Sequence, residues 1–139
     1  MRLLGNIKLP IRGQRYLAKF KDLDSFCCPH RLEDVYRSAT SIYKELTSDF
    51  SIEDHTIVGG QLTWHCTAHK DPESELGSMH SIVSFFCPNT ELEFHVGEET
   101  MLVKDGDIIF FDSTVEHEVR WIGGKKLWQF MSAYCKEVG

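Results

Sequence analysis

The sequence has no apolar run that approaches the length of about 20 residues that a membrane-spanning helix needs. Its first residues, M-R-L-L-G-N-I-K-L-P-I-R-G, are interrupted by polar and basic side chains and lack the apolar core of a secretory signal. The five cysteines include no C-x-x-C spacing, which argues against a zinc knuckle and a thioredoxin-like motif. These absences favour a cytoplasmic protein with reduced cysteines and no membrane partner.

An excess of positive charge is also missing, since the formal net charge is −6. Phosphate binding needs a positive surface, so nucleic acid is not an expected partner, although basic residues do gather between Arg12 and Lys21. No internal repeat or low-complexity tract is present. With 139 residues, 42% of them hydrophobic and 26% charged, the chain is expected to fold as one globular domain over 1–139.

The N-terminal part is predicted to be helical. We expect a short strand near Gly5–Leu9 and some helix around Arg15–Phe26. Apolar residues between Leu32 and Leu46 recur at intervals of three and four, which predicts an amphipathic helix. Residues 1–50 are therefore interpreted as a helical support region.

After Ser51 the pattern changes to short strands separated by turns. His55–His69 is expected to be extended, and Ser81–Cys87 is a compact apolar strand closed by Pro88. The segment E-L-E-F-H-V (91–96) alternates between apolar and polar side chains, and further strands follow at T-M-L-V-K, I-I-F-F-D, V-E-H-E-V-R-W-I and K-L-W-Q-F-M-S-A-Y-C. The prediction is a mainly β protein with an N-terminal helix (α+β), whose core over 51–139 is an antiparallel jelly-roll.

Three side chains in this β region have the composition of a metal site. His69 and Asp71 are two residues apart, but composition alone would supply about 0.45 such pairs in a chain with seven histidines. His117 follows an apolar strand and its turn, where it would sit at the end of an inward-facing row with Val119 and Trp121. Two histidines and a carboxylate form the facial triad of non-haem iron(II) oxygenases, which leaves coordination positions open.

The residues that carry this pattern resemble a known superfamily. H-K-D-P (69–72) and E-L-E-F-H-V-G-E-E-T-M-L-V-K-D-G-D-I-I-F-F-D-S-T-V-E-H-E-V (91–119), with a basic residue shortly afterwards, resemble the 2-oxoglutarate- and iron(II)-dependent oxygenases. The resemblance covers roughly 57–135 and extends to two branches. Asp71 favours the prolyl hydroxylases, whereas the strand start Ser78-Met79-His80 is similar to the aspartyl/asparaginyl β-hydroxylases.

The resemblance implies a double-stranded β-helix (cupin-like) that holds Fe(II) on His69, Asp71 and His117, with no catalytic residue beyond these ligands. It also implies 2-oxoglutarate as co-substrate together with O2, and a basic residue that pairs with the far carboxylate of 2-oxoglutarate. Lys126, nine positions after His117, is the candidate, and Lys125 and Arg120 are alternatives. Arg120 is out of phase with His117 and is expected to point outward.

Other residues near these positions allow more than one interpretation. His65 and His80 could lie near the site, because His65, Thr67, His69 and Asp71 share a face if their strand is regular. His95 is expected to be exposed. Core packing is the default for Trp64, Trp121 and Trp128, although Trp128 could instead line the co-substrate pocket.

The predicted function is hydroxylation of a peptide or protein side chain, or of a small molecule, with release of succinate and CO2. A cupin-like metal-binding protein is one alternative, although the H-x-H pair expected of such a protein is absent from the sequence. A non-catalytic β-sandwich that serves as an interaction module is the other, because a fold does not fix a function.

Overall fold

Strands account for most of the chain that the computed structural model describes, which is residues 1–6, 30–31 and 49–138. One turn of 3₁₀ helix at Asp54–Thr56 precedes the main run of strands. Within the described residues, no helix has the length and apolar character needed to cross a membrane. The strands are β1 (Arg2–Asn6), β2 (His30–Arg31), β3 (Phe50–Ile52), β4 (Val58–Leu62), β5 (Cys66–His69), β6 (His80–Phe86), β7 (Thr90–Val96), β8 (Glu99–Val103), β9 (Asp107–Asp112), β10 (His117–Gly124) and β11 (Trp128–Glu137).

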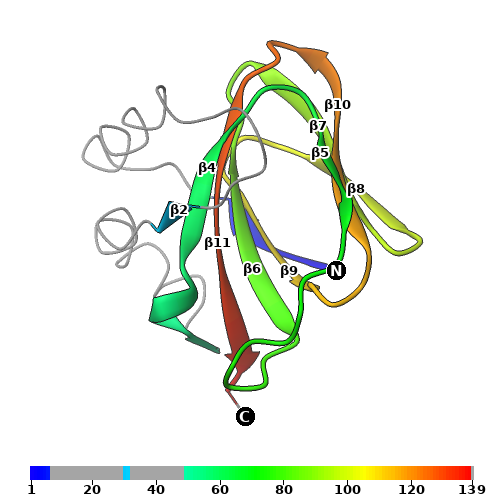
Figure 1. Cartoon of the computed structure of the whole chain (residues 1–139). Coiled ribbons are helices and arrows are strands. Elements are labelled where there is room, and N and C mark those ends of the chain that lie inside the picture. The colour runs from blue at the N-terminus through cyan, green and yellow to red at the C-terminus, as the bar shows by residue number, and fades with distance from the viewer. Residues whose placement is uncertain (7–29, 32–48, 139) are drawn as a thin grey trace.

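The strands form two antiparallel sheets that face each other (Figure 1). The larger sheet has the order β1-β9-β6-β11-β4-β2, with β3 also paired to β11, and the smaller sheet has the order β5-β10-β7-β8. From β4 onward the chain passes repeatedly from one sheet to the other, so that β5 and β10 of the small sheet are each followed by a strand of the large one. This is the winding of a jelly-roll, and it confirms the predicted core.

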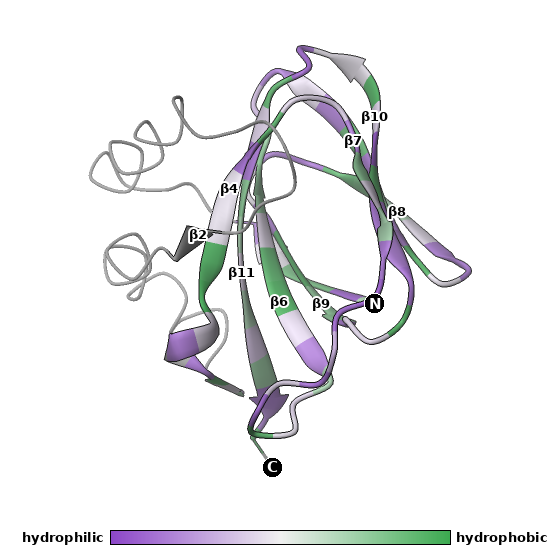
Figure 2. Cartoon of the chain, in the orientation of Figure 1, coloured by the Kyte–Doolittle hydropathy of each residue, from purple (hydrophilic) through white to green (hydrophobic). Residues whose placement is uncertain are grey.

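The core lies between the two sheets because the strands alternate in polarity. In β7, Leu92, Phe94 and Val96 are buried, whereas the side chains between them face outward. β6 differs, because all residues from 81 to 86 are buried, and the strand is coloured hydrophilic at one end and hydrophobic further along (Figure 2). Phe94 packs edge-on against Phe111 and Phe85, with ring centroids 4.9 Å and 5.4 Å away. This aromatic packing joins the small sheet to the large one.

The sequence predicted the strands of the second half well. The expected strand Ser81–Cys87 is β6, and the alternating segment 91–96 lies within β7. An N-terminal strand is observed at Arg2–Asn6, where it pairs with β9 and overlaps the start of the strand expected near Gly5–Leu9; residues 7–9 lie outside the described residues. The helices expected around Arg15–Phe26 and over Leu32–Leu46 fall outside the described residues, so the helical support region stays a prediction.

Candidate metal centre

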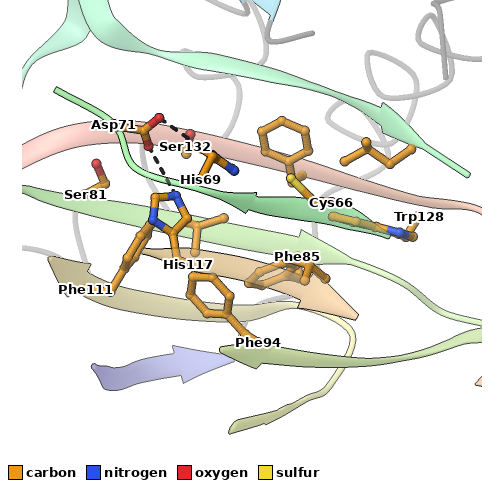
Figure 3. A pocket seen from close by; sticks show the side chains of 14 residues that line it. Cys66, His69, Asp71, Ser81, Phe85, Phe94, Phe111, His117, Trp128 and Ser132 are labelled. Atoms are coloured by element: carbon orange, nitrogen blue, oxygen red, sulfur yellow. Dashed lines mark ion pairs between the residues drawn. The ribbon is translucent and has the colours of Figure 1, made fainter. Parts of the chain in front are cut away.

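His69, Asp71 and His117 converge at one end of a cavity between the sheets (Figure 3). Their potential ligand atoms all lie within 4.8 Å of one another. Asp71 is placed between the two imidazoles, with Oδ1 3.6 Å from His69 Nε2 and Oδ2 3.3 Å from His117 Nε2. The His117 side chain is only 7% exposed, whereas those of His69 and Asp71 are 38% and 40% exposed. The cluster is therefore anchored in the core on one side and open to solvent on the other.

Each histidine ring is oriented by a hydrogen bond from Nδ1 to a backbone carbonyl two residues earlier. His69 Nδ1 lies 2.8 Å from the carbonyl of Thr67, and His117 Nδ1 lies 2.8 Å from the carbonyl of Val115. A carbonyl oxygen only accepts, so Nδ1 carries the proton and Nε2 of the neutral ring presents its lone pair. Both rings thus have the tautomer that a metal bound at Nε2 requires.

An irregularity between β5 and β10 brings His69 opposite His117. The two histidines are register partners, but the next paired residues are Cys66 and Val119, so β5 has one more residue than β10 in this interval. Such a bulge shifts the alternation of side chains along the strand. Cys66 and His69 therefore both line the cavity, and the expectation that His65 shares the face of His69 is wrong. His65 instead accepts a hydrogen bond at Nδ1 from the backbone N–H of Trp121 (2.9 Å).

The turn before β10 is fixed by its own polar side chains. Asp112 Oδ1 accepts hydrogen bonds from the Thr114 backbone N–H (2.9 Å) and hydroxyl (2.6 Å), as aspartates commonly do in such turns. Burial raises the pKa of the Asp112 carboxyl, but the Thr114 hydrogen bonds and the nearby His80 together lower it below its usual value. The turn is therefore best formed with Asp112 ionised, and it delivers His117 to the cavity.

Ser113, which is fully buried in this turn, connects His117 to Asp71. Its backbone carbonyl accepts from the Asp71 N–H (2.9 Å), and its own N–H donates to the Met79 carbonyl (3.0 Å). Asp71 and Met79 lie near the two ends of the segment 70–79, which joins β5 to β6. One buried residue thus sets the position of Asp71 relative to the second histidine.

The cavity has a volume of about 90 Å³ and is mostly apolar. It extends from the three polar side chains towards Trp128, and its aromatic walls come from both sheets (Figure 3). Besides the cluster, its polar lining consists of Cys66, Ser81 and Ser132, and no lysine or arginine of the described residues lines it. The remaining lining residues are Leu62, Val83, Phe85, Phe94, Phe111, Val119, Trp128 and Phe130.

Lys126 lies outside this cavity. Its Nζ is 4.3 Å from the ring centroid of Trp64 and 5.0 Å from that of Trp121, so its ammonium group makes cation–π contacts with both indoles. Trp64 is 47% exposed and has a φ of 99°, and its carbonyl accepts from Trp128 Nε1 (2.7 Å). The core location expected for Trp64 is therefore wrong, whereas Trp128 is buried and lines the cavity.

The other basic and imidazole candidates also lie away from the cluster. Arg120 points outward and pairs with Glu118 across 2.6 Å, as its phase along the strand predicted. Lys125 is exposed and does not line the cavity. His80 stacks on Phe110 with the rings 4.8 Å apart and nearly parallel, so the expectation that it approaches the cavity mouth is wrong. The cavity residues of that strand are instead Ser81, Val83 and Phe85, because adjacent strand residues face opposite sides.

The donor set fits a divalent transition metal. Two imidazole nitrogens and one carboxylate are the ligands of facial-triad iron(II) sites, and the partly exposed side of the cluster leaves room for exchangeable ligands. The same three side chains would also suit Mn(II), Co(II) or Zn(II), because the geometry of the ligands alone does not select among these ions. The cluster is thus a site that could bind a metal, at the partly exposed end of a mostly apolar cavity.

Comparisons with known proteins agree with the fold. No protein-family profile matches the sequence, and no curated protein does. Among solved structures, a ribosomal oxygenase of Escherichia coli is similar with a TM-score of 0.51 and 10% identity over 79% of this chain and 31% of that chain. A cupin-2 domain protein of Shewanella frigidimarina has a TM-score of 0.49 and 10% identity over 89% of this chain and 97% of that chain. A 2OG-Fe(II) oxygenase family protein of Burkholderia pseudomallei has a TM-score of 0.48 and 14% identity over 71% of this chain and 51% of that chain. At such identities the likeness to the E. coli protein shows a cupin-like fold and nothing finer.

Proposed function

We propose that the protein is an Fe(II)- and 2-oxoglutarate-dependent dioxygenase that hydroxylates a peptide or protein side chain or a small molecule. The observation that carries the proposal is the convergence of His69, Asp71 and His117 at the partly exposed end of a mostly apolar cavity, with both Nε2 atoms directed at the carboxylate. Iron bound to these residues would supply the activation of O2. The acidic net charge argues against a nucleic-acid substrate.

The protein residues would orient the ligands and exclude water. The hydrogen bonds from Nδ1 of His69 and His117 to backbone carbonyls keep Nε2 available as a ligand without rotation of either ring. The aromatic walls formed by Phe94, Phe111 and Trp128 leave few places for water beside the reacting groups. The site therefore needs no acid or base beyond the metal ligands.

Lys126 is the residue that we propose to pair with the far carboxylate of 2-oxoglutarate. It lies two residues before Trp128, the first residue of β11. Trp128, Phe130 and Ser132 all line the cavity, so the two-residue period of the strand extends to Lys126. Its ammonium group would have to leave Trp64 and Trp121 to reach the cavity.

A second candidate function is a cupin-type metal enzyme that uses no anionic co-substrate. The observation in its favour is that no cationic side chain of the described residues lines the cavity, so a buried carboxylate would have no opposite charge beside it. Such an enzyme would bind a metal on the same three residues and a largely apolar substrate among the aromatic rings.

Turnover of 2-oxoglutarate separates the two candidates. Wild-type protein with Fe(II), O2 and 2-oxoglutarate is expected to release succinate, even slowly without the primary substrate, and Asp71→Ala is expected to release none. His95→Ala is the matched control, because His95 also forms a histidine–carboxylate pair, with Glu93 (3.2 Å), outside the cavity. Metal binding without any metal-dependent binding of 2-oxoglutarate would reject the dioxygenase and retain the second candidate.

A further inference from the structure

The segment that carries Asp71 is bound by a partly buried carboxylate, that of Glu53. Glu53 follows β3, and because β3 pairs with the end of β11, Glu53 lies beside the segment 70–79. Its Oε1 accepts hydrogen bonds from the hydroxyls of Ser74 (2.9 Å) and Ser78 (2.6 Å). Ser74 and Ser78 also bond to each other, through the Ser78 N–H to Ser74 Oγ (2.9 Å) and the Ser74 N–H to the Ser78 carbonyl (2.9 Å). One carboxylate oxygen thus bonds two serines of this segment, which Lys136 Nζ also contacts through the Leu76 carbonyl (2.8 Å).

Glu53 is in turn joined to the strand next to the site. Its backbone N–H donates to the Tyr134 carbonyl (2.9 Å), and the Tyr134 hydroxyl donates to the Pro72 carbonyl, directly after Asp71. Burial raises the pKa of the Tyr134 phenol, and the charges of Asp71 and Glu53 raise it further. Glu53 and Tyr134 therefore support the Asp71 segment at adjoining points.

We propose that Glu53, acting through Ser74 and Ser78, is a positioning residue that fixes Asp71 for metal binding. This inference rests on the proposed metal site. Asp71 has a side chain 40% exposed and lies outside any strand, so packing alone does not fix it as it fixes His117. Hydrogen bonds to an ionised carboxylate are stronger than those between neutral groups, and a preorganised ligand loses less freedom when the metal binds. Loss of a group that orients a metal ligand typically weakens metal binding by about 10–100-fold.

The test measures the affinity for Mn(II) alone in the wild type, in four variants of Glu53 and the two serines, and in one control variant. Glu53→Ala and the double variant Ser74→Ala/Ser78→Ala are each expected to weaken Mn(II) binding at least about ten-fold. Combining all three substitutions is expected to add less than about two-fold, because they remove the same contact. Glu53→Gln keeps an acceptor oxygen for the two hydroxyls and is expected to recover most of the affinity.

Asp107→Ala is the matched control for general destabilisation. Asp107 is a buried carboxylate that accepts from the Lys104 N–H (2.8 Å) and from Asn6 (2.9 Å), at the end of β9 away from Ser113. This variant is expected to lower the melting temperature and to leave the Mn(II) affinity of the folded protein unchanged. Wild-type affinity in Glu53→Ala, or an equal loss in Asp107→Ala, would overturn the positioning role.

Hydrogen exchange of the metal-free protein separates failure of this inference from failure of the metal site. Amides of 70–79 are expected to exchange faster in Glu53→Ala, whereas those of β10 remain protected. Faster exchange in 70–79 would support the role of Glu53 in holding this segment. Absence of Mn(II) binding in the wild type would be a separate result, and it would reject the proposed function. Unchanged exchange in 70–79 would overturn the positioning role of Glu53.

Discussion

The position of Lys126 allows a quantitative prediction about the co-substrate. In this structure its ammonium group contacts Trp64 and Trp121 at 4.3 Å and 5.0 Å from the ring centroids. A cation–π contact at an exposed site stabilises by about 0.5–1 kcal/mol, so Lys126→Met is expected to cost about 1 kcal/mol in unfolding free energy. If Lys126 also pairs with the far carboxylate of 2-oxoglutarate in the cavity, the same substitution leaves a buried charge without a partner. That loss costs about 3–5 kcal/mol of binding free energy, or roughly two to four orders of magnitude in affinity.

Tryptophan fluorescence gives the readout, because Lys126 must leave the indoles when 2-oxoglutarate binds. Titration of 2-oxoglutarate into Mn(II)-loaded wild-type protein without O2 is expected to change the emission. Lys126→Met is expected to lose both the change and the affinity, whereas Lys125→Met, an exposed neighbour, is expected to retain both. Metal-dependent binding of 2-oxoglutarate to Lys126→Met with wild-type affinity would refute the pairing and leave Lys126 as a surface cation–π residue.

Three further predictions concern the Asp112 carboxyl, two buried cysteines and the packing of Phe94. Because the pKa of Asp112 is lowered in the folded protein, its ionised carboxyl stabilises the fold above its unfolded pKa, and this contribution is lost as the pH falls below about 4. Asp112→Asn should therefore make the unfolding free energy from urea titrations less dependent on pH in this acidic range. Burial, with nearby carboxylates, raises the pKa of Cys87 and of Cys135 to about 12. With a thiolate fraction of about 10⁻⁵ at pH 7, both should resist iodoacetamide in native protein and react after unfolding, as followed by mass spectrometry; rapid native labelling would contradict their burial. Phe94→Ala should lower the free energy of unfolding, measured with urea, by about 3–5 kcal/mol. Leu102→Ala, at an exposed position, should lower it by less than about 0.5 kcal/mol, and equal losses would contradict the assigned core.

The strands of the second half were predictable because their alternation is regular. Leu92, Phe94 and Val96 recur at every second position, and burial of one face of a sheet produces that period directly. Trp128, Phe130 and Ser132 follow the same rule into the cavity. A regular strand thus reveals its buried face without any knowledge of its neighbours.

The parts that sequence reasoning missed depend on pairing between distant segments. The bulge in β5 turns Cys66 rather than His65 towards the cavity, and it arises from the way β5 pairs with β10. Glu53 and Ser113 act through hydrogen bonds to a segment that is not adjacent in sequence, and no local pattern marks them. Ser81 was missed because β6 is buried on both faces from residue 81 to 86, so that no alternation of polarity marks its cavity face.

Binding of one metal ion per chain is the most direct test of the central claim. Titration of Mn(II) followed by the EPR signal of the free ion is expected to show one bound ion in wild-type protein and in His95→Ala. His69→Ala, Asp71→Ala and His117→Ala are each expected to lose that ion while they retain the fold, as judged by circular dichroism. Undiminished Mn(II) binding in these three variants, or none in the wild type, would contradict the assignment of His69, Asp71 and His117 as the metal centre.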